Sequence, residues 1–208
     1  MPSEVSICNI ALDHIGKAQI SALNEDSAEA QVCSRHYALA RDAVLTKYNY
    51  RFLRGLQSLA QLTTNDRSNA WPYAYAVPTN VLRVRRVIPQ IEGSELLSDA
   101  YPYAASGEMV EARIPYELEG GNLYCNLETV TLEYTRNDVD ASAYGQPVAD
   151  AIATELAGRI AYPLTRDRQL RGDMLQLAVR ARMDAEVWDA RQSAHSSDIQ
   201  STLVISRN

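Results

Sequence analysis

Cysteine is scarce in this chain, which has three thiols in 208 residues. Cys8, Cys33 and Cys125 are odd in number and widely spaced, unlike the cysteines of a disulfide-stapled secreted domain. We therefore expect reduced thiols and assembly in a cytosol. Long apolar runs are also missing, as is a signal peptide at the N-terminus, so the sequence predicts no membrane span and no membrane partner.

Motifs of cofactor binding and of nucleophilic catalysis are missing too. The nine glycines are scattered, and neither a glycine-rich phosphate loop nor a Gly-x-Ser-x-Gly elbow occurs. The arrangement nearest to a metal site pairs Cys8 with His14 and Cys33 with His36, but only the second pair has a spacing that shares a helix face. A buried cysteine on an apolar stripe usually acts as a small hydrophobic residue. We expect no catalytic residue, no cofactor and no metal, and we expect that the protein is not an enzyme.

Phenylalanine is almost missing, with one Phe against twelve Tyr. A Tyr side chain buries its ring while keeping a polar tip, so it favours surfaces that become interfaces. The composition is otherwise that of an ordinary globular protein, 46% hydrophobic and 22% charged. The aromatic usage therefore indicates contact with other proteins.

Two neighbouring segments carry charges of nearly one sign each, the first basic and the second acidic, although the formal net charge is only −6. Residues 46–89 carry seven basic side chains and one acidic one, whereas residues 90–145 carry two basic and eleven acidic ones. The acidic residues are dispersed over predicted strands, which favours a solvated face over a general acid/base pair. Arg83, Arg85 and Arg86 lie in the basic segment, with Arg83 and Arg85 on one predicted strand face. Two interpretations stay open for these three: a row that meets a neighbouring subunit, or a patch that faces DNA phosphate.

A first helical pair is predicted at the N-terminal end. Apolar residues follow helical spacing up to Gly16, and glycine is the residue that most often directly follows the end of a helix. Asp26 stands three residues before Glu29, as in a capping box, and would begin a second helix that runs to about Tyr48. Residues 1–56 thus form the predicted N-terminal helical pair.

A second helical pair, in residues 146–192, organises the rest of the chain. Pro147 suits a first helical turn, Pro163 is predicted to break the helix, and Thr165 or Asp167 would cap the next one. Two amphipathic helices joined by a short turn form an antiparallel pair, which would complete a four-helix bundle with residues 1–56. The apolar positions spaced by three, four and seven are Val148, Ile152, Leu156 and Ile160, then Leu170, Met174, Leu177, Ala181 and Trp188.

Between the helical pairs, helical periodicity disappears and five of the eight prolines occur. The predicted class is α+β, with residues 57–145 forming an antiparallel β-rich domain inserted into the bundle. Glu119-Gly120-Gly121 is a hairpin turn by its composition, and the strand after the hairpin is predicted to complete a three-stranded meander. Alternating apolar residues predict strands at 73–77, 81–85, 114–118, 122–126 and 129–135.

The last segment, residues 193–208, carries five serines and no helical stripe. Within it, Thr202, Leu203, Val204 and Ile205 form a compact β-prone apolar run that gains nothing from exposure. Such a segment is typical of an extended arm that adds as a strand to a partner's sheet edge. We expect residues 193–208 to be an arm that binds through these four residues.

Four stretches in order also resemble parts of a known family. They resemble, in turn, an opening helix with its glycine, a second helix, an aromatic strand with a proline turn, and a third helix. The family is that of tail tubular protein A, or head-to-tail adaptors, of tailed bacteriophages, and the similarity covers most of residues 3–190. The stretches are Val5 to Gly16, Asp26 to Asp42, Trp71 to Pro78 followed by Leu82-Arg83-Val84, and Ala153 to Thr165.

This resemblance implies a structural virion protein, which forms a dodecameric ring between the portal protein and a tail or nozzle protein. Genomic DNA would pass through the ring without tight binding. The implied fold is a helical bundle whose β-domain points toward the tail. The implied location is the neck or tail of the virion, with the host cytoplasm during assembly. Competing hypotheses are another head-completion or tail-terminator ring protein, a DNA-binding regulator and an unrecognised hydrolase.

Overall fold

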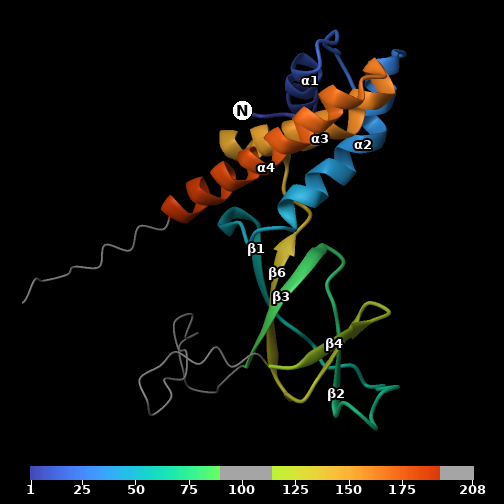
Figure 1. Cartoon of the computed structure of the whole chain (residues 1–208). Coiled ribbons are helices and arrows are strands. Elements are labelled where there is room, and N and C mark those ends of the chain that lie inside the picture. Colours follow the sequence, from blue (N-terminus) through green and yellow to red (C-terminus); the bar gives the residue numbers. More distant parts are fainter. Residues whose placement is uncertain (90–113, 193–208) are drawn as a thin grey trace, which may run out of the picture.

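The computed structural model describes residues 1–89 and 114–192. Within these ranges the chain has the α+β class, with four α-helices and two antiparallel sheets of three strands each. The helices, from both ends of the chain, gather in one half of the molecule, and the strands form the other half (Figure 1). The predicted arm of residues 193–208, including Thr202 to Ile205, lies outside the described residues, as does residue range 90–113.

The N-terminal helices are those that the sequence predicts, with one correction. Helix α1 (Glu4–His14) ends just before Gly16, whose φ of 67° is the left-handed conformation that a glycine adopts without strain. Helix α2 (Ala28–Leu45) does not begin with a capping box of Asp26 and Glu29. Its N-cap is Ser27, whose hydroxyl accepts the Ala30 N–H at 3.2 Å, because this side chain reaches the third residue of the helix.

The C-terminal helices correct a second prediction. Helix α3 (Gln146–Thr165) runs through Pro163 instead of breaking there. The proline lies in the last turn, where it removes one helical hydrogen bond, while the Thr165 hydroxyl still donates to the Ala161 carbonyl at 2.6 Å. The helix ends at Arg166, whose φ is 61°. Of the two predicted caps it is Asp167 that caps helix α4 (Arg168–Arg191), accepting backbone N–H groups at 2.8 and 3.0 Å.

Helix α3 is the centre of the helical half. It contacts α1, α2 and α4, whereas α1 and α2 contact each other only slightly. The predicted stripe is confirmed, because its four members are fully buried. They are Val148, Ile152, Leu156 and Ile160.

The two sheets differ from the predicted meander. The hairpin of β4 (Tyr116–Glu119) and β5 (Asn122–Cys125) is confirmed, and Gly120 and Gly121 turn it with φ values of 57° and 82°. Strand β2 (Tyr73–Ala76) pairs with β5 on its other side. The remaining strands form the second sheet in the order β1-β6-β3, and their bounds are Arg54–Ser58, Val130–Arg136 and Val81–Pro89.

Strand β6 is therefore not the third strand of the hairpin meander. Six of its seven residues are buried, on both faces of the strand, and such a strand is stable only at the centre of a sheet. Strand β1, which the sequence did not predict, covers one edge of β6, and β3 covers the other. Among the helices of the described ranges, none is long and apolar enough to cross a membrane.

Candidate functional site on the outer face of helix 4

Helix α4 packs on α3 through the residues that the sequence placed on its apolar stripe. Leu170, Met174, Ala181 and Trp188 lie against the helical core, and Leu177 is half-buried. The stripe is therefore confirmed as the inner face of α4. Three residues of this helix are fully covered: Ala178, Ala185 and Asp189.

Two glycines allow α4 to approach α3 this closely. A Cβ atom at Gly145 would lie 2.2 Å from Cη2 of Trp188, and one at Gly158 would lie 2.8 Å from Cδ2 of Leu175. Any larger residue at these positions would displace the side chain of α4 that packs there. The position of α4 is thus defined near both of its ends.

Two buried carboxylates also hold α4 in place. Glu155 of α3 is 8% exposed and accepts Nη1 of Arg182 at 3.3 Å and Nη2 of Arg159 at 3.0 Å. Asp189 is 2% exposed, and each of its oxygens lies 3.3 Å from the Arg51 N–H just before β1. Burial raises the pKa of Asp189. The hydrogen bond from the Arg51 N–H and the positive charge of Arg51 act in the opposite direction. Helix α4 is therefore held to α3 and to the start of the β-half.

Besides its inner stripe, α4 carries four large apolar side chains that the described part of the chain leaves at least 40% exposed, and the first of them, Leu175, also packs against Gly158 of α3. They stand at intervals of four residues, so they form one continuous row along the helix. We name this row the α4 ridge. It consists of Leu175, Val179, Met183 and Val187, which are 40%, 44%, 61% and 49% exposed.

An apolar row of this kind on a firmly held helix is typical of a protein contact surface. Scattered exposed apolar residues need no explanation, but four in register on one helix face do. Our sequence reasoning missed the ridge because it assigned α4 a single apolar stripe. The signal was present, since residues 175, 179, 183 and 187 are all apolar.

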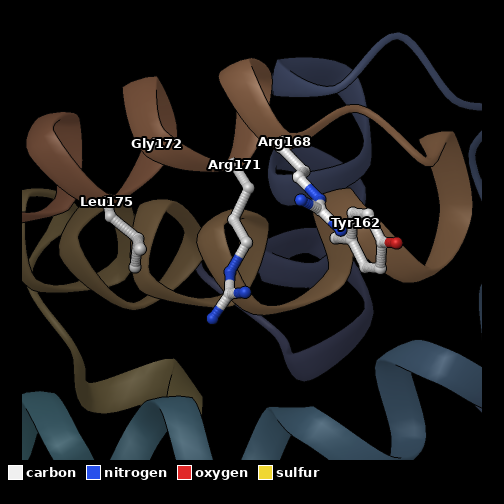
Figure 2. Close-up of a pocket in the computed structure, with 5 residues that line it drawn as sticks. All are labelled: Tyr162, Arg168, Arg171, Gly172 and Leu175. Carbon is white, nitrogen blue, oxygen red and sulfur yellow. The ribbon is translucent and has the colours of Figure 1, made fainter.

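The N-terminal end of the α4 ridge opens into a cationic hollow of about 450 Å³. The guanidinium of Arg168 lies over the Tyr162 ring at 5.9 Å from its centroid, and Arg171 and Leu175 extend beside this pair (Figure 2). Within the described ranges neither arginine forms an ion pair. Gly172 completes the lining of the hollow, and Leu175 belongs to both the hollow and the α4 ridge. A partner that covers the ridge therefore also meets the unpaired positive charges of Arg168 and Arg171.

The three arginines of the predicted basic patch lie together where β3 meets the end of α2, but all three have partners within the chain. Arg83 is exposed and donates to the Thr46 carbonyl at 2.6 Å. Arg85 donates to the Leu45 carbonyl at 3.3 Å and to Oγ1 of Thr135 at 2.7 Å, and burial lowers its pKa. Positive charge at the C-terminal carbonyls of a helix is favourable, so these two arginines cap α2.

Arg86 has a different partner, which is a buried carboxylate. Its Nε donates to Oε2 of Glu133 at 2.5 Å, and Glu133 is 2% exposed. Asn49 donates to the other oxygen of Glu133 at 3.1 Å. Arg85 and Arg86 are therefore half-buried parts of the fold, and Arg83 is the member of the patch that is exposed to another molecule.

The acidic segment is also partly neutralised within the chain. Arg67 forms ion pairs with Glu117 and Glu119, and the Trp71 indole donates to Glu117 at 2.8 Å. Arg136 pairs with Asp138 at 2.9 Å. The charge segregation along the sequence thus overstates the charge that is free for contacts between subunits.

The Cys8 and Cys33 thiols are buried where α1 and α2 meet the helical core. Their mutual hydrogen bond, with burial, raises the pKa of the Cys8 thiol. Among the described residues, no group of three or more His, Cys, Asp or Glu side chains is arranged to hold a metal ion. In comparisons with known proteins, no family model matches the chain, and a search of curated proteins finds no match.

Proposed function

We propose that this chain is a structural subunit of a tailed-phage virion, a head-to-tail adaptor that links the portal protein to the tail and surrounds the DNA channel. The observation that carries the proposal is the α4 ridge, since four exposed apolar side chains on a firmly held helix form a surface for other proteins. The resemblance of four sequence stretches to the adaptor family is the reason for proposing this particular assembly.

In this proposal the four helices form a bundle in which the β-rich half is an inserted domain, directed toward the tail or nozzle protein. Residues 193–208 form the arm that binds a partner. Twelve subunits close into a ring in the neck of the virion, after assembly in the host cytoplasm. A closed ring needs a repeated contact between two different faces of the subunit, and genomic DNA passes through it without being gripped.

Contact between the basic row of one subunit and acidic residues of the next subunit in the ring remains a prediction. A charge reversal at Arg83 is its cleanest test. Reversing Arg83, Arg85 and Arg86 together would remove two caps of α2 and leave the buried Glu133 without its arginine, so the fold itself would suffer. Reversal of Arg83 alone changes an exposed charge and leaves the other two contacts in place. An Arg83→Glu ring that forms on the portal with unchanged salt dependence would contradict the charge argument.

The decisive experiment combines the full chain with purified portal oligomers and follows the complex by sedimentation and electron microscopy. We expect a ring bound to the portal for the natural chain and loss of binding for Met183→Asp. Leu39→Asp is the matched control, because Leu39 is 56% exposed on α2, away from the α4 ridge. Equal binding by both variants would exclude the ridge as the docking surface, and no binding by the natural chain would contradict the adaptor role.

The unpaired Arg168 and Arg171 are the observation that favours a second candidate, a DNA-binding regulator. Binding to duplex DNA rests on several Lys or Arg contacts with phosphate and weakens steeply with salt. A gel shift at micromolar protein that disappears in Arg168→Ala/Arg171→Ala and in high salt would support the regulator. For an adaptor we expect no shift at physiological salt.

A further inference from the structure

We propose that, in the free subunit, the C-terminal arm binds the open edge of β1 in its own chain and adds to that sheet as a strand, through Thr202 to Ile205. The inference rests on the part of the proposed function that makes residues 193–208 a binding arm, although not on the portal or the ring. It names the surface that the arm occupies before assembly.

Strand β1 is at one edge of its sheet, since β6 pairs with it on one side and no other strand of the described ranges pairs with it. The backbone groups that face the open side follow from the register. Leu59, in register with the strand pairs, donates its N–H to the Val130 carbonyl at 3.0 Å. Because hydrogen-bonded pairs alternate along an antiparallel ladder, Gly55 and Gln57 bond to β6. The N–H and C=O of Leu56 therefore point to the open edge.

The side chain of Leu56 is exposed as well, at 50%. An open strand edge with an apolar side chain is a template for pairing with another segment of chain, and proteins commonly cover such an edge. Leu56 thus offers a backbone donor, a backbone acceptor and an apolar side chain together. An added strand with apolar side chains is the kind of ligand that engages all three.

The arm begins close to this edge. Asp189, in the last turns of α4, lies 3.3 Å from the Arg51 N–H just before β1, so α4 ends near the start of that strand (Figure 1). Leu56 is five residues beyond Arg51, at most about 18 Å along the chain. The linker of residues 193–201 spans roughly 30 Å when extended, which is long enough to bring Thr202 back to β1.

The apolar run of the arm suits the edge in either register. Successive side chains of a strand point to opposite faces of the sheet. Val204 would be on one face, and Leu203 and Ile205 on the other. Whichever register forms, an apolar side chain comes to the face that carries Leu56.

The short linker favours the edge of the same chain over that of a second copy. A segment tethered in this way has an effective concentration of about a millimolar, which free copies reach only in concentrated solution. The contact would cover the edge of β1 against pairing between copies. It would also keep the apolar run of the arm covered until a partner in the assembly takes the arm over.

The test is amide hydrogen exchange of the free full-length chain, followed by NMR. We expect the Leu56 amide to exchange slowly in the natural chain. Leu203→Pro and Val204→Pro each remove one N–H, and neighbouring N–H groups of a strand point in opposite directions. One of the two variants should therefore accelerate exchange at Leu56 about tenfold, and the other less. Ser196→Pro, in the linker, is the matched control and should leave Leu56 unchanged.

The amides of Gly55 and Gln57 bond to β6, so their unchanged exchange verifies that β1 is folded in every variant. A Leu56 amide that exchanges fast in the natural chain, or that neither proline in the run affects, overturns the inference. Equal acceleration by Ser196→Pro also overturns it, because the effect then does not come from a strand in the run. Slow exchange that is lost on dilution by about a hundredfold would mean that a second copy supplies the strand, which contradicts the contact within one chain.

The measurement needs no portal, so its failure and that of the adaptor proposal are distinguishable. If the run protects Leu56 but no ring forms on the portal, the strand contact stands and the adaptor proposal fails. If a ring forms while Leu56 exchanges fast in the free chain, the adaptor proposal stands and the strand contact is wrong.

Discussion

Helices α3 and α4 are neighbours of similar length, 20 and 24 residues, yet twelve residues of α3 are buried and only three of α4. Both carry apolar residues at helical spacing. The difference lies in what surrounds them, because within the described ranges α3 packs against α1, α2 and α4, whereas the main contact of α4 is with α3. Apolar spacing thus shows that a helix has a face to cover, but not what covers it.

The comparison has an energetic side. Burying a Val, Leu or Met side chain stabilises a fold by about 1.5–3 kcal/mol relative to leaving it exposed. In α3 that free energy stabilises the subunit itself. On the α4 ridge much of it is not realised within the chain, so it remains available for association with another protein.

The largest expected effect comes from truncating the centre of α3. Leu156 is fully buried, so Leu156→Ala removes core contacts and leaves a cavity, and we expect the free energy of unfolding to fall by about 2–5 kcal/mol. The matched change on the ridge, Met183→Ala, should stay within about 0.5 kcal/mol in dilute solution, because Met183 is 61% exposed. Urea unfolding measures both, and equal losses would mean that the ridge is covered within the subunit.

A second, smaller effect concerns the packing of α4 on α3. Gly145→Ala would place a methyl group in the Trp188 ring, so we expect a loss of about 1–3 kcal/mol and a shifted Trp188 fluorescence in a Trp71→Phe background. Gly172→Ala is the control within α4, where no atom lies within 4 Å of the added Cβ. That change should stabilise the helix by about 0.5–1 kcal/mol. If Gly145→Ala is neutral, Trp188 does not anchor α4.

Much of the helical half could be predicted from the sequence because its determinants are local. The core stripe of α3 and the cap at Asp167 follow from spacing and side-chain chemistry, and both are confirmed. The predicted break at Pro163 was wrong, because α3 continues for two residues beyond the proline to Thr165 although it loses the hydrogen bond that an N–H at this position would make. The N-cap moved from Asp26 to Ser27 because two neighbouring residues offer similar caps.

The sheets and the candidate site were less predictable because they depend on distant partners. Strand β6 joins β1 and β3 rather than its sequence neighbours, and no local pattern shows this. The three arginines of the predicted basic row follow one another on β3, but the partner of Arg86, Glu133, lies 47 residues away in sequence. The ridge was visible as a spacing, yet only the packed structure shows that nothing in the described ranges covers it.

A third prediction tests the ion pairs that join the two helices. Arg182→Ala removes the contact from α4 to Glu155 and leaves Arg159, so we expect a loss of about 1 kcal/mol in the free energy of unfolding. Arg159→Ala removes a contact within α3 to the same carboxylate and should cost about 0.3–0.5 kcal/mol. A larger loss for Arg159→Ala than for Arg182→Ala would show that this carboxylate does not hold α4.

The smallest expected effect is a change in pH dependence at the far end of α4. The pKa of Asp189 is raised mainly by burial, so the folded state binds this proton more tightly than the unfolded state does. The contribution of Asp189 to stability is therefore greatest at low pH. It decreases as pH rises from the usual Asp pKa of about 3.9 through the raised value, and it is constant above that.

Asp189→Asn removes this titration and keeps an oxygen that can accept the Arg51 N–H. Urea unfolding at pH values from 4 to 7 should show the variant gaining stability relative to the natural chain as pH rises. Asp189→Ala is the control, since it leaves the Arg51 N–H without its acceptor and should be less stable than Asp189→Asn throughout. Parallel curves for Asp189→Asn and the natural chain would show that the pKa of the buried carboxylate does not change on folding.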